Sequence, residues 1–260
     1  MGKELAIAPF NYMAIGSGWV GSQAVNETGQ RWMSAARTAV RLGAAGWMSE
    51  MVGQAKEIRV VISASNHNFV SGSHLHPQML AAAGGSWPTA ANTLWRIVVN
   101  PGVQLVAEFS QTQCFWFGGA INGTVIIENH GHILGRGGSY GVGRESGSAG
   151  SDAIYRESKI TLDIQNYGVI AGGGGGGGGS WEDPYEERRA TSGGGGAPFG
   201  PKASYTNPGS AGRNAGVGGA WGQDGFGGQS GGRGGSAGFA FAGGGNIIWT
   251  NRGDVRGRIV

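Results

Sequence analysis

The 260-residue sequence has little cysteine, little net charge and no long apolar run. Its one cysteine, Cys114, excludes an internal disulfide and the cysteine-rich zinc motifs. The formal net charge is only +3 and the Lys and Arg residues are scattered, which argues against a nucleic-acid partner. No apolar run has transmembrane length, and Met1–Tyr12 lacks the apolar segment and cleavage site of a secretory signal. We therefore expect synthesis in a cytoplasm without a signal peptide, which does not confine the protein's work to that compartment.

The sequence also lacks a recognisable catalytic or metal-binding arrangement. Gly16-Ser-Gly-Trp-Val-Gly21 fits the spacing of a dinucleotide fingerprint, but no βαβ pattern and no suitably placed acid follow it. The pairs His74-x-His76 and His130-x-His132 have no carboxylate or cysteine at metal-site spacing, so we predict solvated loop histidines, no metal and no cofactor. Nothing arranges a nucleophile, a base and an acid, and we predict no enzyme activity.

Glycine is what the sequence has in abundance. Of its 56 glycines, 44 fall in residues 116–260, and eight stand consecutively from Gly172 to Gly179. Such a run forms neither a helix interior nor an ordinary strand, because glycine loses the most backbone freedom on folding and has no side chain to pack. Two structures remain possible for this run. It is either a flexible linker or an extended threefold polyglycine helix packed against similar rods. The glycine-rich stretches alternate with aromatic residues, in which disordered segments are poor, so we predict packed rods.

Residues 1–115 have a more ordinary composition. Apolar residues at helical spacing predict a helix that begins after Thr28 and ends before Gly43. Between residues 57 and 109, β-branched segments predict a small antiparallel sheet with a long excursion at 65–93. Three tryptophans close together before this sheet indicate either a small core or an apolar docking surface, and these are Trp19, Trp32 and Trp47.

An internal repeat, Asn-x-Gly-x-(Ile/Val)-x-Gly preceded by a strand, occurs three times. Its copies begin at Asn129, Asn166 and Asn251, and the first two lead directly into glycine-rich stretches. Asn and Gly favour the bend, and burial of the Ile or Val side chain fixes the position of the segment that follows the bend. Because the copies are unevenly spaced, we predict three strand-bend units at the base of the rods and not a regular solenoid.

The segments between the rods carry the candidate binding residues. The longest, Ser180–Ser192, holds two aromatic residues, four acids and two arginines, a composition like that of antibody paratopes. It is either a solvated turn or a binding loop on a rigid scaffold, and we favour the binding loop. The candidate binding residues are Trp181, Glu182, Asp183, Tyr185, Tyr205, Trp221, Phe226, Phe239 and Phe241.

Several of these segments together resemble a known family. Gly18–Ala36, with Arg41–Gly43 and Trp47–Ser49, is similar to the N-terminal part of the receptor-recognising adhesins at the tips of the long tail fibres of T-even-type bacteriophages. Asn166–Gly172 with its polyglycine run, and Gly193–Gly200, resemble the glycine-rich motifs of that family. The resemblance covers nearly the whole chain from about residue 13.

The resemblance implies a mixed fold of two parts. A small α+β attachment domain, residues 1–115, would precede a receptor-binding domain of packed polyglycine II helices with short strands, residues 116–260. Trp19, Trp32 and Trp47 would lie in the region that attaches one copy of the chain to the trimeric distal long-tail-fibre protein.

The loops between the rods would then bind a host outer-membrane protein or surface glycan, and the protein would sit in the virion at the fibre tip. Two alternatives stay open. A tail-fibre assembly chaperone would need no array of binding loops. An enzyme that degrades surface polysaccharide would need paired carboxylates in a groove, and the acids of the 180–192 segment are too local to suggest one.

Overall fold

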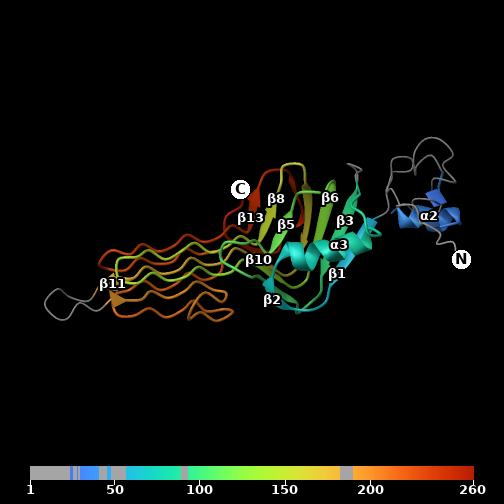
Figure 1. Ribbon diagram of the computed structural model, residues 1–260. Helices are drawn as coiled ribbons and strands as arrows, with labels where there is room; N and C mark the ends of the chain where they lie inside the picture. The colour runs from blue at the N-terminus through green and yellow to red at the C-terminus, as the bar shows by residue number, and fades with distance from the viewer. Residues whose placement is uncertain are drawn as a thin grey trace, which may run out of the picture.

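The computed structural model describes residues 24–25, 28, 30–40, 46–47, 57–88, 93–181 and 190–260. Helical structure within these ranges is limited to α2 (Met33–Ala39), α3 (His76–Ala82), a π-helical segment (Ser71–Leu75) and isolated helical residues near α2. None of the helices so described has the length and apolar content needed to span a bilayer. The remaining structure is a body of strands and a long glycine-rich projection (Figure 1).

Three sheets build the body, and the strands within each are parallel. The first sheet consists, in spatial order, of β1 (Glu57–Ile62), β3 (Leu94–Val99), β6 (Thr124–Asn129), β9 (Thr161–Asn166) and β14 (Ile247–Asn251). The second consists of β2 (Asn66–Phe69), β4 (Gln104–Ala107), β7 (His132–Leu134), β10 (Val169–Ala171) and β15 (Asp254–Arg256). The third consists of β5 (Phe115–Phe117), β8 (Ile154–Arg156) and β13 (Phe241–Gly243). A two-stranded ribbon, β11 (Ser180–Trp181) with β12 (Ala190–Thr191), lies far from the body at the end of the projection (Figure 1).

From β3 on, the chain visits the three sheets in turn and begins each coil one strand further along, which makes the body a parallel β-helix; in the first coil, β1 and β2 are followed by the π-helical segment and α3. The predicted antiparallel sheet is therefore wrong. Asn100-Pro-Gly102 does not join two partners of a hairpin, but turns the chain from β3 in the first sheet to β4 in the second. Alternating apolar residues look the same in parallel and antiparallel strands, so the pattern could not decide between them.

The body is a solenoid, although the uneven spacing of the copies predicted no regular one, and the reason for this spacing is visible in the topology. Coils of this β-helix carry insertions of very different lengths, at residues 135–153 between β7 and β8 and at 172–240 between β10 and β13. These insertions make the repeat spacing uneven while the strands keep a common register. The predicted domain boundary falls inside β5, although the sheets run continuously across it.

The interior of the β-helix is apolar because alternate residues of each strand point inward. In β3 these are Trp95, Ile97 and Val99, each completely buried, and the facing residues of β6 and β9 pack beside them. Burying one such side chain contributes about 1.5–3 kcal/mol. A one-residue slip would expose the whole set, which fixes the register of the strands.

The Asn-x-Gly repeat marks the corner between the first and second sheets. Asn129 and Asn166 are completely buried, and the amide nitrogen of Asn129 donates to the Asn166 side-chain oxygen at 2.7 Å. Each side-chain oxygen also accepts the N–H of the glycine two residues later, Gly131 or Gly168. A Cβ on Gly168 would lie 1.9 Å from the Gly131 carbonyl oxygen, so only glycine allows the coils to stack this closely.

The projection consists of extended segments that run alternately away from the body and back. These segments are residues 136–141, 145–151, 172–179, 192–197, 209–212, 216–219, 223–228 and 232–238. Its centre is the run of eight glycines, every one of which is buried.

The hydrogen bonds of this central run repeat every three residues. From Gly173 on, its N–H groups donate in turn to three neighbouring segments, 145–151, 194–197 and 223–226. Its carbonyl groups accept from three further segments, 138–141, 216–222 and 232–238. A Cβ on any glycine of the run would approach backbone atoms of a neighbour within 2.5 Å, which explains why no other residue type occurs there.

Candidate functional site

The two ends of the projection have different neighbours. Turns at 142–145, 213–215 and 229–231 and the ribbon of β11 and β12 lie at the free end, where they bond to one another. The turns at 198–208 and 220–222 lie at the base, next to the second sheet. Side chains at the free end can meet a partner, whereas those at the base connect the projection to the body.

Trp181 is an aromatic residue of the free end, as the place of its strand β11 in Figure 1 shows. Its backbone N–H donates to the Ser230 hydroxyl at 3.2 Å, and the same hydroxyl donates to the Trp181 carbonyl at 2.8 Å. Its indole ring packs over Gly143, where a Cβ would lie 3.1 Å from the ring. Trp181 keeps 36% of its surface exposed, so a rigid aromatic side chain is held open to a partner.

Three arginines surround this end of the projection, and the sequence analysis did not single them out. Arg144, Arg213 and Arg233 are exposed and belong to the turns or to the segment ends beside them. Within the described part of the chain, their guanidinium groups make no hydrogen bond or ion pair. Arginine and tryptophan are the residues most enriched at interface hot spots, so the free end combines two favourable contact types.

Tyr205 and Trp221, by contrast, lie at the base. The Tyr205 ring stacks on His132 of β7 at a centroid distance of 5.9 Å, and its hydroxyl is hydrogen-bonded to Nδ1 of His132. Trp221 donates its indole N–H to the Tyr205 carbonyl at 2.8 Å, and the Arg256 guanidinium lies over its ring. Burial lowers the pKa of His132, with nearby Arg256 acting in the same direction, and burial raises the pKa of the Tyr205 hydroxyl.

This cluster attaches the projection to the second sheet, and its aromatic rings face the body. Trp221 is only 8% exposed, so its assignment as a receptor anchor is corrected to a structural contact. Tyr205 is half-buried in the same cluster and is corrected in the same way. Both corrections follow from the direction of the segments, which a run of glycines does not encode.

The three phenylalanines of the predicted set lie in three different surroundings. Phe241 is completely buried in the body, with Trp249 at 5.2 Å, so its assignment as a receptor anchor is wrong. Phe239 is half-buried where the projection returns to the body, under the Arg258 guanidinium. Phe226 lies on an outgoing segment with 64% of its surface exposed and stays a candidate contact.

Several predicted residues fall outside the described ranges or are partly described. Glu182, Asp183, Tyr185 and Trp19 lie outside the described residues. Trp32 and Trp47 are 79% and 80% exposed, and the Arg37 side chain donates to the Trp47 carbonyl at 2.7 Å. Their assignment to fibre attachment stays a prediction.

Four of the five histidines are half-buried and packed against aromatic rings, in contrast to the predicted solvated loops, whereas His67 is exposed on β2. His74 stacks on Phe69 in the body, and His130 stacks on Tyr167 at a centroid distance of 4.9 Å. Among the described residues, no group of three or more His, Cys, Asp or Glu side chains could hold a metal ion.

A stiff projection whose free end gathers tryptophan and arginine from separate turns is the arrangement of a binding protein, because rigid scaffolds hold contact loops at low entropic cost. Two family models match the chain: one described as phage tail fibre adhesin Gp38, over residues 57–260, and one described as its N-terminal domain, over residues 13–52. The chain belongs to the phage tail fibre adhesin Gp38 family.

Relatives agree with this assignment. The receptor-recognizing protein gp38 of Salmonella phage S16 is 32% identical over 162 residues, which cover 62% of this chain and 61% of that protein. The matched region is thus less than two thirds of the relative's length. A chain in the crystal structure of the gp37-gp38 adhesin tip complex of the bacteriophage S16 long tail fibre is similar with a TM-score of 0.69 and 29% identity, over 95% of this chain and all of that one.

Proposed function

We propose that this protein is a tail-fibre tip adhesin that binds a host outer-membrane protein or surface glycan through the free end of its projection. The observation that carries the proposal is the placement of Trp181 in β11 and of three exposed arginines together at the free end of the projection, far from the body. The relative from phage S16 is named for receptor recognition. Glu182, Asp183 and Tyr185 follow Trp181 directly in the sequence and belong to the proposed contact surface, with Phe226 at its side.

We infer that the projection is a sandwich of polyglycine II helices. A three-residue period in the hydrogen bonds is the period of this helix, which has no internal hydrogen bonds and must bond to its neighbours. The central run bonds to neighbours on all sides, so each backbone group is satisfied without side chains. Such a sandwich is stiff, which a projection that presents a binding site requires.

The proposed fibre partner is the distal long-tail-fibre protein, a trimer capped by one copy of this chain. Support comes from the complex of gp37 with gp38 in the similar structure and from the separate family model for residues 13–52. Trp32 and Trp47 are exposed and suit an apolar docking surface together with Trp19. Because the sheets join residues 57–260, we assign attachment to the region before β1 and place the domain boundary at residues 53–56.

The proposed location is the virion, at the tip of the long tail fibre, and the proposed role is non-enzymatic. The family names describe adhesins, and the alternative role of an assembly chaperone has no support in them.

Replacement of Trp181 by Ala tests the proposal. We expect adsorption of phage to host cells to fall about 30-fold, because hot-spot residues contribute about 2 kcal/mol each. The melting temperature of the purified protein should stay the same. Trp116→Ala is a matched control, since Trp116 is also 36% exposed but lies on the third sheet of the body. If both variants adsorb like the wild type, the free end does not carry receptor binding.

A further inference from the structure

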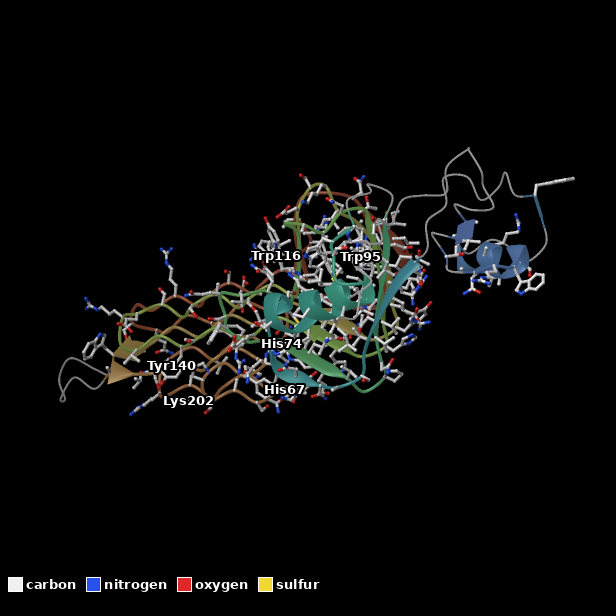
Figure 2. The ribbon with its side chains drawn as sticks, turned by 45° about the vertical axis from the view of Figure 1, so that its right-hand side comes forward. His67, His74, Trp95, Trp116, Tyr140 and Lys202 are labelled. Carbon is white, nitrogen blue, oxygen red and sulfur yellow. The ribbon has the colours of Figure 1, made fainter. Side chains whose placement is uncertain are left out.

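A hollow of about 410 Å³ lies where the base of the projection meets the body. Three segments line it, and they are the turn 108–111 after β4, the start of the projection at 136–139, and the base turn at 199–201. Its volume falls within the roughly 300–1,000 Å³ of small-molecule sites. We call it the basal hollow. His67, labelled in Figure 2, lies beside it, because the His67 carbonyl and the neighbouring Phe199 ring both contact Arg136.

Arg136 forms a positioned donor in the basal hollow. Its Nη1 atom donates to the carbonyls of Ala107 and Glu108 at 3.1 and 2.7 Å, and it also contacts Asn68 and the His67 carbonyl at 3.0 Å. These contacts fix the guanidinium plane. Among the described residues, Nε and Nη2 have no hydrogen-bond partner, and the side chain lines the hollow. Half-burial lowers the pKa of Arg136, although it stays charged.

The polar groups beside Arg136 are also free. Glu108, Ser110, Gln111 and Ser139 line the hollow, and none of their side chains makes a hydrogen bond to the described part of the protein. The Glu108 carboxylate can only accept hydrogen bonds, and the Arg136 guanidinium beside it can only donate them. The serine hydroxyls and the Gln111 amide can do both. Such a set matches a ligand that has many neutral groups able both to donate and to accept.

Two aromatic rings complete the hollow. Phe109 is 57% exposed, and its turn is fixed because Thr112 Oγ1 bonds to both the N–H and the carbonyl of Phe109. Phe199 packs on His67 at a centroid distance of 4.8 Å and on Tyr205 at 5.6 Å. Phe199 has a φ of 53°, a backbone conformation that is uncommon for a residue with a side chain and that concentrates at functional sites.

We propose that the basal hollow binds a saccharide. Sugar hydroxyls can donate to the Glu108 carboxylate and accept from the Arg136 guanidinium, and the C–H face of a sugar ring can pack on Phe109. A phosphate would be repelled by Glu108, and a cationic group by Arg136, so the paired charges favour a neutral polyhydroxylated ligand. This site lies at the base of the projection and not at its free end, so it stands or falls independently of the proposed receptor contacts.

The test uses the full-length protein and soluble oligosaccharides released from the lipopolysaccharide of a bacterium that the phage infects, with glucose, galactose and N-acetylglucosamine as separate probes. Saturation-transfer NMR and titration should show binding to at least one of them with a Kd of about 1 mM or lower. Phe109→Ala and Glu108→Gln should each weaken it at least about tenfold while the melting temperature is kept. Tyr167→Ala is the matched control, because Tyr167 is a similarly exposed aromatic residue, 59% against 57% for Phe109, on the corner between β9 and β10, and it should bind like the wild type.

The outcomes separate this proposal from the proposed function. If none of the saccharides binds, or if wild type, Phe109→Ala and Glu108→Gln bind them equally well, the saccharide proposal is overturned. It is also overturned if inorganic phosphate or a peptide from an outer-membrane protein, and no saccharide, occupies the basal hollow. Saccharide binding that Trp181→Ala abolishes and Phe109→Ala leaves unchanged would lie at the free end and would also overturn the proposal. Lower adsorption of the Phe109→Ala phage to intact cells, with no difference on cells whose glycan is truncated, would identify the ligand as host surface glycan. Equal adsorption with saccharide binding lost would identify it as a free sugar.

Discussion

The β-helix and the projection pair their backbone hydrogen-bonding groups and pack their interiors in two different ways. In the β-helix, parallel ladders pair the backbone and an apolar core packs inside them, with residues such as Ile97 and Ile127 completely buried. In the projection, the central run Gly172–Gly179 has no side chains, and backbone segments pack directly on one another. The difference teaches that burial of apolar side chains and close backbone contact are alternative ways to offset the entropy of ordering the chain.

The two ways differ in what they tolerate. An apolar core accepts another apolar residue of similar volume at modest cost. A buried glycine between six backbone segments accepts no other residue, because even a Cβ would overlap a carbonyl oxygen. Exposed positions at the free end carry no such constraint, which lets Trp181 and the arginines occupy them.

The largest effect is expected for Gly175→Ala. A Cβ at this position would lie 1.9 Å from the Gly235 carbonyl oxygen, so segments must separate and several hydrogen bonds must break. We expect a loss of more than about 4 kcal/mol and little soluble folded protein. Gly72→Ala is the matched control, because a Cβ there meets nothing within 4 Å, and it should fold normally. Thermal unfolding and soluble yield are the measurements, and equal stability of the two variants would contradict close backbone packing.

The next effect compares two phenylalanines, one from each region. Phe241→Ala removes a completely buried ring from the β-helix and should cost about 3–5 kcal/mol. Phe226→Ala removes a ring that is 64% exposed on the projection and should change stability by less than about 0.5 kcal/mol. Denaturant unfolding measures both. Equal costs would mean that the projection also depends on apolar side chains.

A smaller effect is expected at the corner asparagines. Asn166→Ala removes a buried side chain that bonds to Asn129, Gly168 and the carbonyls of β15 and its preceding turn, and should cost about 2–3 kcal/mol. The third copy of the repeat provides the control, because Asn251 makes no side-chain hydrogen bond to any described residue. Asn251→Ala should cost less than about 0.5 kcal/mol. Similar costs at both positions would show that the hydrogen bonds of Asn166 add nothing.

The smallest effect concerns the cluster that joins the two regions. Burial lowers the pKa of His132, so the unfolded chain binds a proton here at a higher pH than the folded protein does. The stability that neutral His132 contributes is therefore complete above the unfolded pKa of about 6.5 and is lost as the pH falls below it. Between pH 7.5 and 5.5 the melting temperature should fall by about 2 °C more in the wild type than in His132→Gln. An identical pH dependence in both proteins would exclude His132 as the cause.

The sequence by itself determined the positions where the backbone packs closely and the residues that make the corners. Eight consecutive glycines predict rods, and Asn-x-Gly predicts a repeated bend, because each depends on the local conformational freedom of the residue or on a hydrogen bond to a residue two positions away. Trp181 was also predicted as a contact residue, because the segment that follows it has the composition of a binding loop.

Only the tertiary structure decided whether neighbouring strands are parallel, which turns lie at the free end, and which aromatic residues are buried. Every second residue of a strand points inward whether its neighbours are parallel or antiparallel. The sequence pattern therefore could not distinguish the β-helix from an antiparallel sheet. Glycine segments carry no side chains that would mark their direction, so Trp221 at the base and Trp181 at the free end look equivalent in the sequence. Their different surroundings come from residues far away in the chain, such as His132 for Trp221 and Ser230 for Trp181.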